Sequence, residues 1–260
     1  MRPSSLIAVV VAAVGTAVAQ SWKPSLTNGS YKIEGQTFKN RGYWDFSKLA
    51  DNAKLPAGLI ASGYPVGKTH AYNVNNVYIQ NKYLNLRVNG NQTKMPFQSA
   101  EIFTQVNNIK YASVRTVAIF AEPAGVCNGM FFYKNDNQET DIEWLSDPAT
   151  QSNNPRGSAR KIWFANQAID DKTDKSWTAV ASPSNPTTTE HEYRIDWTPG
   201  LVRFFIDGKE SWRTDKSVPT EKGPWVFNNW ANGDKGWSCG PPKTDAIFRI
   251  KEIDMYYNTA

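Results

Sequence analysis

Residues 139–145 read Glu139-Thr140-Asp141-Ile142-Glu143-Trp144-Leu145. Successive side chains of a β-strand point to opposite faces, so an extended conformation places the three carboxylates on one face. Ile142 points to the other face, which is predicted to be core because Trp144 and Leu145 continue the strand with apolar residues. The stretch therefore predicts a strand with one buried apolar face and one acidic face.

The rest of the chain carries the same kind of signal. Short runs rich in Val, Ile, Tyr, Phe and Trp, bounded by Gly, Pro, Asn and Asp, are typical of strands. They occur at residues 77–79, 83–88, 100–104, 111–120, 129–133, 161–164, 192–197, 202–206, 225–230 and 247–257. Beyond residue 20 we expect at most one helical turn, at residues 52–60. The pattern predicts an all-β fold, a jelly-roll sandwich of two antiparallel sheets.

The acidic face indicates chemistry. Like-charged neighbours on a sheet oppose folding and raise one another's pKa, which favours one protonated and one ionised carboxyl at the same pH. The Cα atoms of Glu139 and Glu143 lie about 13 Å apart in a strand. Inward-leaning side chains bring the carboxyls to about 5–6 Å, which suits a retaining glycosidase. A solvated acidic face and a calcium site stay open as alternatives.

The N-terminus has the features of a secretory signal peptide. Arg2 provides a positive start, residues 6–18 are almost unbroken apolar sequence, and residues 17–19 form a small-residue cleavage site. We expect residues 1–19 to be removed and residues 20–260 to form a single secreted, extracellular domain. Asn28-Gly29-Ser30 and Asn91-Gln92-Thr93 are expected N-glycosylation sites.

Composition narrows the class of partner. The net charge is +5, and the basic residues are spread rather than clustered, which argues against a nucleic-acid-binding surface. The apolar N-terminal run is too short for a membrane-spanning helix. Ten Trp, eleven Tyr and twelve Phe either stack on sugars or fill the core. We expect a monomer that binds a polysaccharide or oligosaccharide and requires no cofactor.

The two cysteines, Cys127 and Cys239, are expected to form one disulfide, because an even count in an oxidising compartment favours pairing. Two buried free thiols are the alternative. His70 and His191 do not have metal-ligand spacing to each other or to the cysteines. The sequence therefore predicts no metal site built from these residues.

The acidic run resembles the E-x-D-x-E signature of glycoside hydrolase family 16, and other segments agree with that family in order and spacing from about residue 99. Residues 111–115 and 129–133 resemble the two strands before the signature. Residues 191–200 resemble its H-x-Y-x-x-D-W-x-P-G segment, 204–208 its W-Y-V-D-G hairpin, and 228–230 its N-L-W segment. Together these ordered matches are more specific than the signature alone.

The resemblance implies a concanavalin A-like β-jelly roll with a substrate cleft across the concave sheet. It also implies that Glu139 is the nucleophile, Glu143 the general acid/base, and Asp141 the helper between them. The family contains laminarinases, lichenases, xyloglucan transglycosylases and fungal cell-wall glucanases.

Substrate-binding positions follow from the same resemblance. Glu101, Asn228 and Trp230 fall at sugar-contacting positions of the family. His191 either hydrogen-bonds in the cleft or merely packs, and Trp163 either flanks the cleft or belongs to the core. A further position, Asp254, matches an aspartate near a structural calcium in some members.

The sequence also departs from the family. Asn137 and Gln138 stand where many bacterial members have Trp and Asp, so a stacking platform is lost and the substrate is expected to differ from mixed-linkage glucans. We expect a retaining hydrolase of the endo-β-glucanase type. A transglycosylase and a non-catalytic lectin remain as alternatives, although the intact acidic triad argues against the lectin.

Overall fold

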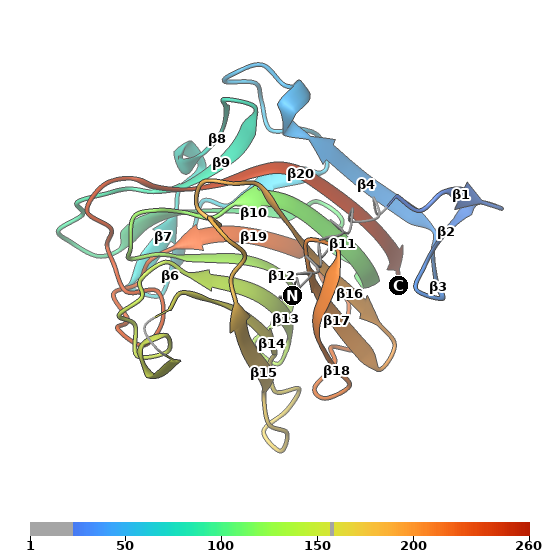
Figure 1. Cartoon of the computed structure of the whole chain (residues 1–260). Coiled ribbons are helices and arrows are strands. Elements are labelled where there is room, and N and C mark those ends of the chain that lie inside the picture. Colours follow the sequence, from blue (N-terminus) through green and yellow to red (C-terminus); the bar gives the residue numbers. More distant parts are fainter. Residues whose placement is uncertain (1–22, 157–158) are drawn as a thin grey trace, which may run out of the picture.

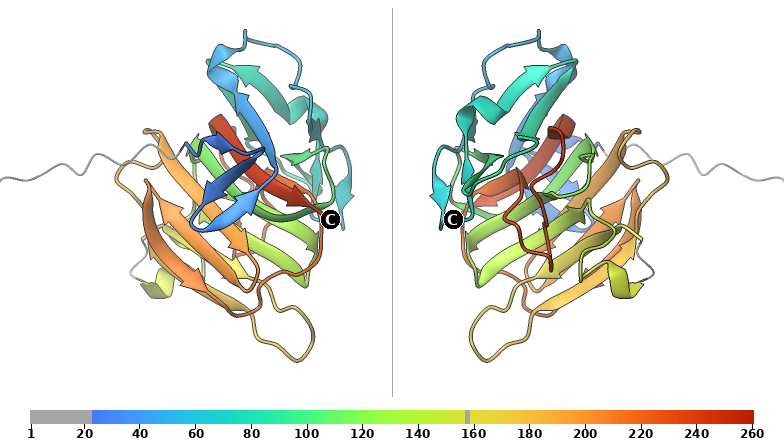
Figure 2. Two further views of the ribbon diagram at one scale, coloured as in Figure 1. Left: turned by 90° about the vertical axis from the view of Figure 1, so that its right-hand side faces the viewer. Right: turned by 90° about the vertical axis from the view of Figure 1, so that its left-hand side faces the viewer.

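The computed structural model describes residues 23–156 and 159–260, so the expected signal peptide at residues 1–19 lies outside the described residues. Two large sheets make up most of the described part. Figure 1 shows them lying face to face, and the side views in Figure 2 show them as two curved layers. The sequence prediction of an all-β sandwich of antiparallel sheets is confirmed.

The nine-stranded sheet carries the carboxylates. Its strands are β5 (Leu59–Ala61), β6 (Pro65–Val66), β7 (His70–Tyr72), β10 (Phe97–Thr104), β12 (Cys127–Asn135), β13 (Gln138–Leu145), β14 (Lys161–Asn166), β15 (Ser176–Ala181) and β19 (Trp225–Trp230). They run in the order β15-β14-β13-β12-β19-β10-β7-β6, with β5 added beside β10. β7 is parallel to β10. Strand β13 therefore lies near the middle of the sheet, between β12 and β14.

The eight-stranded sheet forms the other layer. Its strands are β4 (Asn40–Asp45), β8 (Val77–Gln80), β9 (Tyr83–Val88), β11 (Ile109–Ile119), β16 (His191–Thr198), β17 (Leu201–Ile206), β18 (Lys209–Thr214) and β20 (Ala246–Thr259). They run in the order β18-β17-β16-β11-β20-β9-β8, with β4 added beside β20.

Three short strands and three 3₁₀ turns complete the described part. The strands β1 (Leu26–Thr27), β2 (Ser30–Ile33) and β3 (Gln36–Phe38) form a small sheet at the edge of the molecule, next to the end of β20 (Figure 1). The turns are η1 (Phe46–Lys48), η2 (Val74–Asn76) and η3 (Asn154–Arg156). In the described residues, no helix is long and apolar enough to cross a membrane.

The core lies between the two large sheets because their strands alternate in polarity. In β13, Thr140, Ile142 and Trp144 are buried on the core face. The Trp144 ring stacks on Phe120, with ring centroids 5.0 Å apart and an interplanar angle of 5°. Because alternate residues face opposite sides, this packing turns Asp141 and its flanking glutamates away from the core.

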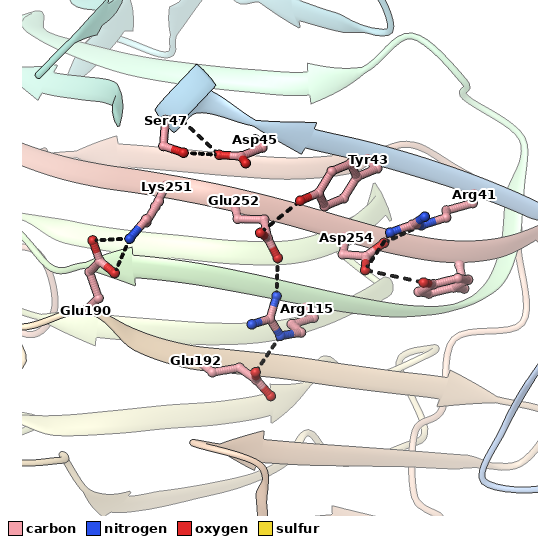
Figure 3. Close-up of polar contacts among 11 residues, drawn as sticks. Arg41, Tyr43, Asp45, Ser47, Arg115, Glu190, Glu192, Lys251, Glu252 and Asp254 are labelled. Carbon is pink, nitrogen blue, oxygen red and sulfur yellow. Dashed lines mark hydrogen bonds and ion pairs between the residues drawn. The ribbon is translucent and has the colours of Figure 1, made fainter. Parts of the chain in front are cut away.

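Ion pairs join neighbouring strands on the eight-stranded sheet (Figure 3). Arg115 on β11 bridges Glu192 on β16 and Glu252 on β20. Arg41 on β4 pairs with Asp254 on β20. These cross-strand pairs of opposite charge hold four adjacent strands together.

Each predicted strand, from residues 77–79 to residues 247–257, corresponds to a strand of the structure, but one local prediction is wrong. Residues 52–60 form turns and the start of β5 rather than a helical turn. Leu55 precedes Pro56, and a residue before proline is disfavoured in the helical region. The 3₁₀ turn forms earlier, at η1, where the Asp45 side chain accepts a hydrogen bond from the Ser47 amide.

Candidate active site

Glu139, Asp141 and Glu143 line one cleft on the nine-stranded sheet. The cleft has a volume of about 570 Å³, and its walls include residues from β6, β7, β10, β12 and β19. Pairing of β13 with β12 on one side and β14 on the other fixes the direction of each carboxylate. The strand period of two therefore delivers all three acids to one surface, as the sequence predicts.

Asp141 is the most enclosed of the three acids, with only 2% of its surface exposed. Burial raises its pKa strongly, and the negative charges of Glu139 and Glu143 on either side raise it further. Gln167 donates a hydrogen bond from Nε2 to Asp141 Oδ2 at 3.0 Å. Asp141 is thus the carboxyl of the row that most strongly retains a proton.

Glu139 has a different electrostatic setting. Burial raises its pKa, but a hydrogen bond from Asp141 opposes this change by favouring the ionised form. The nearby charges of Glu143 and Asp136 raise the pKa, whereas Lys175 lowers it. A protonated Asp141 that donates to Glu139 lets the row hold a proton and a carboxylate side by side.

Glu143 is held by two donors from distant parts of the chain. Trp237 donates from Nε1 to Glu143 Oε1 at 3.1 Å, and the Cys127 thiol donates to the same oxygen at 3.2 Å. Burial raises the pKa of Glu143, and both hydrogen bonds oppose that change. Glu143 is therefore kept in one orientation in a largely apolar setting.

Glu101 on β10 is a fourth buried acid of the cleft. Its Oε1 accepts hydrogen bonds from Ser62 Oγ at 2.6 Å and from Tyr64 Oη at 2.8 Å. Burial raises the pKa of Glu101, and these donors oppose it. With its orientation fixed by the protein, Glu101 is suited to accept a hydrogen bond from a ligand.

Asn228 on β19 faces Glu143 across a glycine. Gly129 on β12 pairs with both residues, and a Cβ atom there would lie 2.6 Å from Asn228 Oδ1. Asn228 donates from Nδ2 to Tyr72 Oη at 3.2 Å. Its Oδ1 is buried and has no hydrogen-bond partner in the described part of the chain. Asn228 Oδ1 at the cleft wall is therefore an acceptor without a donor, and a ligand hydroxyl group would supply that donor.

Aromatic rings from β7 and β19 form one wall of the cleft. Trp230 stacks on His70, with ring centroids 5.2 Å apart. Burial lowers the pKa of His70 to about 4, so the ring is neutral at physiological pH. Tyr72 packs edge-on against His70 at 5.3 Å. A neutral aromatic wall of this kind suits an uncharged ligand that presents C–H faces.

Trp163 and His191 lie on different sheets. Trp163 on β14 pairs with Glu143 in register, is buried, and packs against Trp237 and Trp177. His191 is not in the cleft, so its proposed substrate contact is wrong. It lies on β16 of the other sheet, with Nδ1 2.8 Å from Asp207 Oδ2.

The predicted disulfide is also wrong, because Cys127 and Cys239 are both free thiols. The Cys127 side chain contacts Glu143. The Cys239 sulfur lies 3.8 Å from the carbonyl of Lys235. An even number of cysteines is a property of composition alone. It contains no information on the sheet face that Cys127 shares with the carboxylate of Glu143.

Asp254 does not fit a calcium site. Arg41 donates from Nε to Asp254 Oδ1 at 2.8 Å and from Nη2 to Oδ2 at 3.1 Å, and Tyr256 Oη also donates to Oδ2. A guanidinium thus occupies both oxygens that a cation would need. Among the described residues, no cluster of three or more His, Cys, Asp or Glu side chains is arranged to hold a metal ion.

Sequence reasoning missed several residues of the site. Cys127 was assigned to a disulfide, and Trp237 was not singled out. Trp237 follows a run of turn-forming residues at 232–236, and a large aromatic ring in such a polar loop is a usable signal of function. His70 and Tyr72 come from the short strand β7, and Tyr64 comes from the loop before β6. Their contacts in the cleft are remote in sequence, and no local pattern indicated them.

Comparison with known families and proteins gives a consistent result. The family model described as glycosyl hydrolases family 16 matches residues 67–238. A β-glucanase from Fibrobacter succinogenes is 27% identical over 152 residues, which cover 56% of this chain and 42% of that protein. A β-glucanase from Acetivibrio thermocellus is 27% identical over 125 residues, 46% of this chain and 33% of that protein. The chain spans less than half the length of these curated relatives.

Solved structures share the fold. The β-glucanase of Bacillus licheniformis superposes with a TM-score of 0.64 at 16% identity, covering 85% of this chain and 98% of that one. An endo-β-1,3-glucanase from Pyrococcus furiosus gives a TM-score of 0.65 at 14% identity, with 90% and 100% covered. At such low identity the likeness concerns the fold of the two sheets.

Proposed function

This chain belongs to glycosyl hydrolases family 16, and from that premise we propose that it is a secreted endo-β-glucanase that cleaves internal β-glycosidic bonds with retention of configuration. The observation that carries the proposal is the row of Glu139, Asp141 and Glu143 on one face of β13, within a cleft. The β-glucanase names of the curated relatives support a glucan as substrate.

The proposed reaction has two displacements. Glu139 attacks the anomeric carbon while Glu143 gives its proton to the glycosidic oxygen, so the C–O bond breaks and the leaving sugar departs as an alcohol. Glu143 then takes a proton from water, the water oxygen attacks the anomeric carbon, and Glu139 is released as a carboxylate. The hydrogen bond from Asp141 stabilises Glu139 as a carboxylate before attack and after release.

The lining of the cleft supports a neutral sugar chain. Glu101 and Asn228 offer buried acceptors for hydroxyl groups, and Trp230 offers an aromatic face. Polar acceptors with fixed orientation select the hydroxyl pattern, while the ring contributes stacking of about 0.5–1.5 kcal/mol. This combination is suited to β-linked glucose units, whose axial positions carry only C–H groups.

Secretion is part of the proposal and rests on the N-terminal sequence. The apolar run at residues 6–18 ends in a small-residue cleavage site. The side chains of Asn28 and Asn91 are exposed, and both lie outside strands, which suits their proposed glycosylation. Mass spectrometry of the protein secreted from a eukaryotic host tests both points.

The function is tested with a panel of β-1,3-, β-1,4- and mixed-linkage glucans, with galactan and chitin oligomers as controls. Wild type should release oligosaccharides from at least one glucan, and Glu139→Gln should lose at least about a thousandfold in kcat/KM. Proton NMR of the first-formed product should show the β-anomer. An α-anomer would refute retention, and cleavage of none of the glucans would refute the function.

The same panel separates the alternatives. A transglycosylase shares the glycosyl-enzyme intermediate but transfers it to a sugar, so mass spectrometry would detect products longer than the substrate. A lectin would bind a glucan without turnover, and Glu139→Gln would then change binding alone.

A further inference from the structure

We propose that Cys127 and Trp237 are positioning residues that clamp Oε1 of Glu143, so that Oε2 is the oxygen that carries and returns the catalytic proton. The inference deepens the proposed function and rests on it. It concerns a part of the site that the acidic signature does not contain.

The two donors converge on one atom from separate elements. Cys127 begins β12 and pairs in register with Leu145 and Trp230. Trp237 lies in the segment between β19 and β20. Their contacts with Glu143 Oε1, at 3.2 and 3.1 Å, fall within the ordinary range for a thiol and for an indole N–H.

Cys127 is suited to be a donor rather than a nucleophile. It is fully buried and packs in a small apolar cluster with Leu145 and Trp163. Burial and the adjacent carboxylate of Glu143 raise the pKa of the Cys127 thiol well above its usual value. The sulfur therefore keeps its proton across the working pH range, and that proton is directed at Glu143.

Trp237 is itself held in place. Its ring packs edge-on against Trp163, with centroids 5.0 Å apart, and Lys175 Nζ lies 5.6 Å from its ring centroid. The backbone amide of Trp237 donates to the carbonyl of Asp234 at 3.1 Å. Because the loop and the neighbouring ring both restrain the indole, its N–H keeps a constant direction toward Glu143.

The clamp decides which oxygen reacts. A carboxyl oxygen that accepts two hydrogen bonds has both lone pairs engaged, so the proton of neutral Glu143 resides on the other oxygen. In the first step the Oε2 proton moves to the glycosidic oxygen as the C–O bond breaks. In the second step Oε2 takes a proton from the attacking water, while Oε1 stays bonded to Cys127 and Trp237 throughout.

The clamp also sets the acidity of Glu143. Both donors bind the ionised carboxylate more strongly than the neutral acid, so they offset the rise in pKa that burial causes. Removing a donor should raise the pKa of Glu143. Because a general acid works only while protonated, the alkaline limb of the pH–rate profile should then move upward.

The test compares Cys127→Ala, Cys127→Ser and Trp237→Phe with wild type, and uses Cys239→Ser as the matched cysteine control. The pH dependence of kcat/KM is measured on a glucan oligosaccharide. Each protein is also assayed on an aryl β-glycoside whose acidic phenol leaves without protonation. Carbon-13 NMR titration of Glu143, in protein labelled at glutamate carboxyls, reports its pKa without any turnover.

We expect the alkaline limb and the NMR pKa of Glu143 to rise by about half a pH unit in Cys127→Ala and by about one unit in Trp237→Phe, since a thiol is the weaker donor. Activity on the oligosaccharide should fall roughly tenfold, with little loss on the aryl glycoside. Cys127→Ser should restore much of the wild-type behaviour, and Cys239→Ser should match wild type.

Unchanged limbs and an unchanged NMR pKa in both donor-deleted variants would overturn the clamp, as would equal losses on the two substrates. Trp237→Phe decides the question by itself if Cys127→Ala does not fold. Wild type that cleaves no glycoside would overturn the proposed function instead, and the NMR titration would still decide the clamp.

Discussion

Replacing Arg41 with methionine should leave a buried carboxylate without its counter-charge. Asp254 is 1% exposed at its side chain, and the Arg41 guanidinium binds both of its oxygens. Methionine keeps an unbranched apolar stem of similar reach but removes every donor. The substitution therefore isolates the loss of the ion pair from the loss of packing.

The expected cost follows from the exposure of the two partners. Breaking a fully buried pair costs about 3–5 kcal/mol. The Arg41 side chain is 35% exposed, and Tyr256 still donates to Asp254, so water and one hydroxyl soften the penalty. We expect a loss of about 2–3 kcal/mol, or roughly 5–10 °C in Tm for a chain of this size.

Urea denaturation and thermal melts at neutral pH measure this loss. The double variant Arg41→Met/Asp254→Asn removes both charges and should be more stable than Arg41→Met alone, because no unpaired carboxylate stays buried. Calcium chloride or a chelator should leave the Tm of wild type unchanged, since the guanidinium already occupies the carboxylate. A variant within about 0.5 kcal/mol of wild type, or a wild type stabilised by calcium, would refute the reasoning.

Three further outcomes are expected. Asp141→Asn removes a carboxyl whose pKa is raised by burial and by two glutamates. Such a group lowers the stability of the fold as the pH rises above its unfolded pKa of about 4. The Tm of the variant relative to wild type should therefore increase as the pH is raised from about 4, while its kcat falls. A Tm difference independent of pH would contradict this. Gly129→Ala places a Cβ 2.6 Å from Asn228 Oδ1 and should cost about 1–3 kcal/mol in urea unfolding and raise KM; unchanged KM would count against the contact. Trp177 is 44% exposed and lies in the same cross-strand row as Asp141, two strands or about 10 Å away. Trp177→Ala should lower kcat/KM about 3–10-fold for long glucans only, and an equal loss on short oligosaccharides would exclude a role in extended binding.

The sequence was informative where a residue's role depends on its own neighbours. Strand β13 could be predicted because alternation of acidic and apolar residues is a local property, and it placed the three carboxylates correctly on one face. Strand β15 was missed because it lies at the end of the strand order, and its residues are exposed or half-buried in a mixed pattern. Strand β4 exists because it pairs with β20, more than two hundred residues away.

The contacts of Cys127 and Trp237 with Glu143 could not be predicted either, because they too depend on residues that are remote in sequence. The partner of Cys127 is decided by the register of β12 against β13, and that of Trp237 by the path of a loop. Nothing near either residue in the sequence indicates Glu143. The disulfide prediction failed because it relied on the number of cysteines and the compartment, neither of which contains the geometry of the sheet.

The two faces of β13 have a consequence for the register in which this strand pairs during folding. A shift of one residue in its pairing would drive three carboxylates into the apolar interior and expose Ile142 and Trp144 to solvent. Such a molecule would be much less stable than the native one, so few chains would hold the inactive register at equilibrium. The apolar face of β13 thus selects the register in which the catalytic carboxylates face the cleft. Substitutions that make this face more polar should weaken that selection without changing any reacting group.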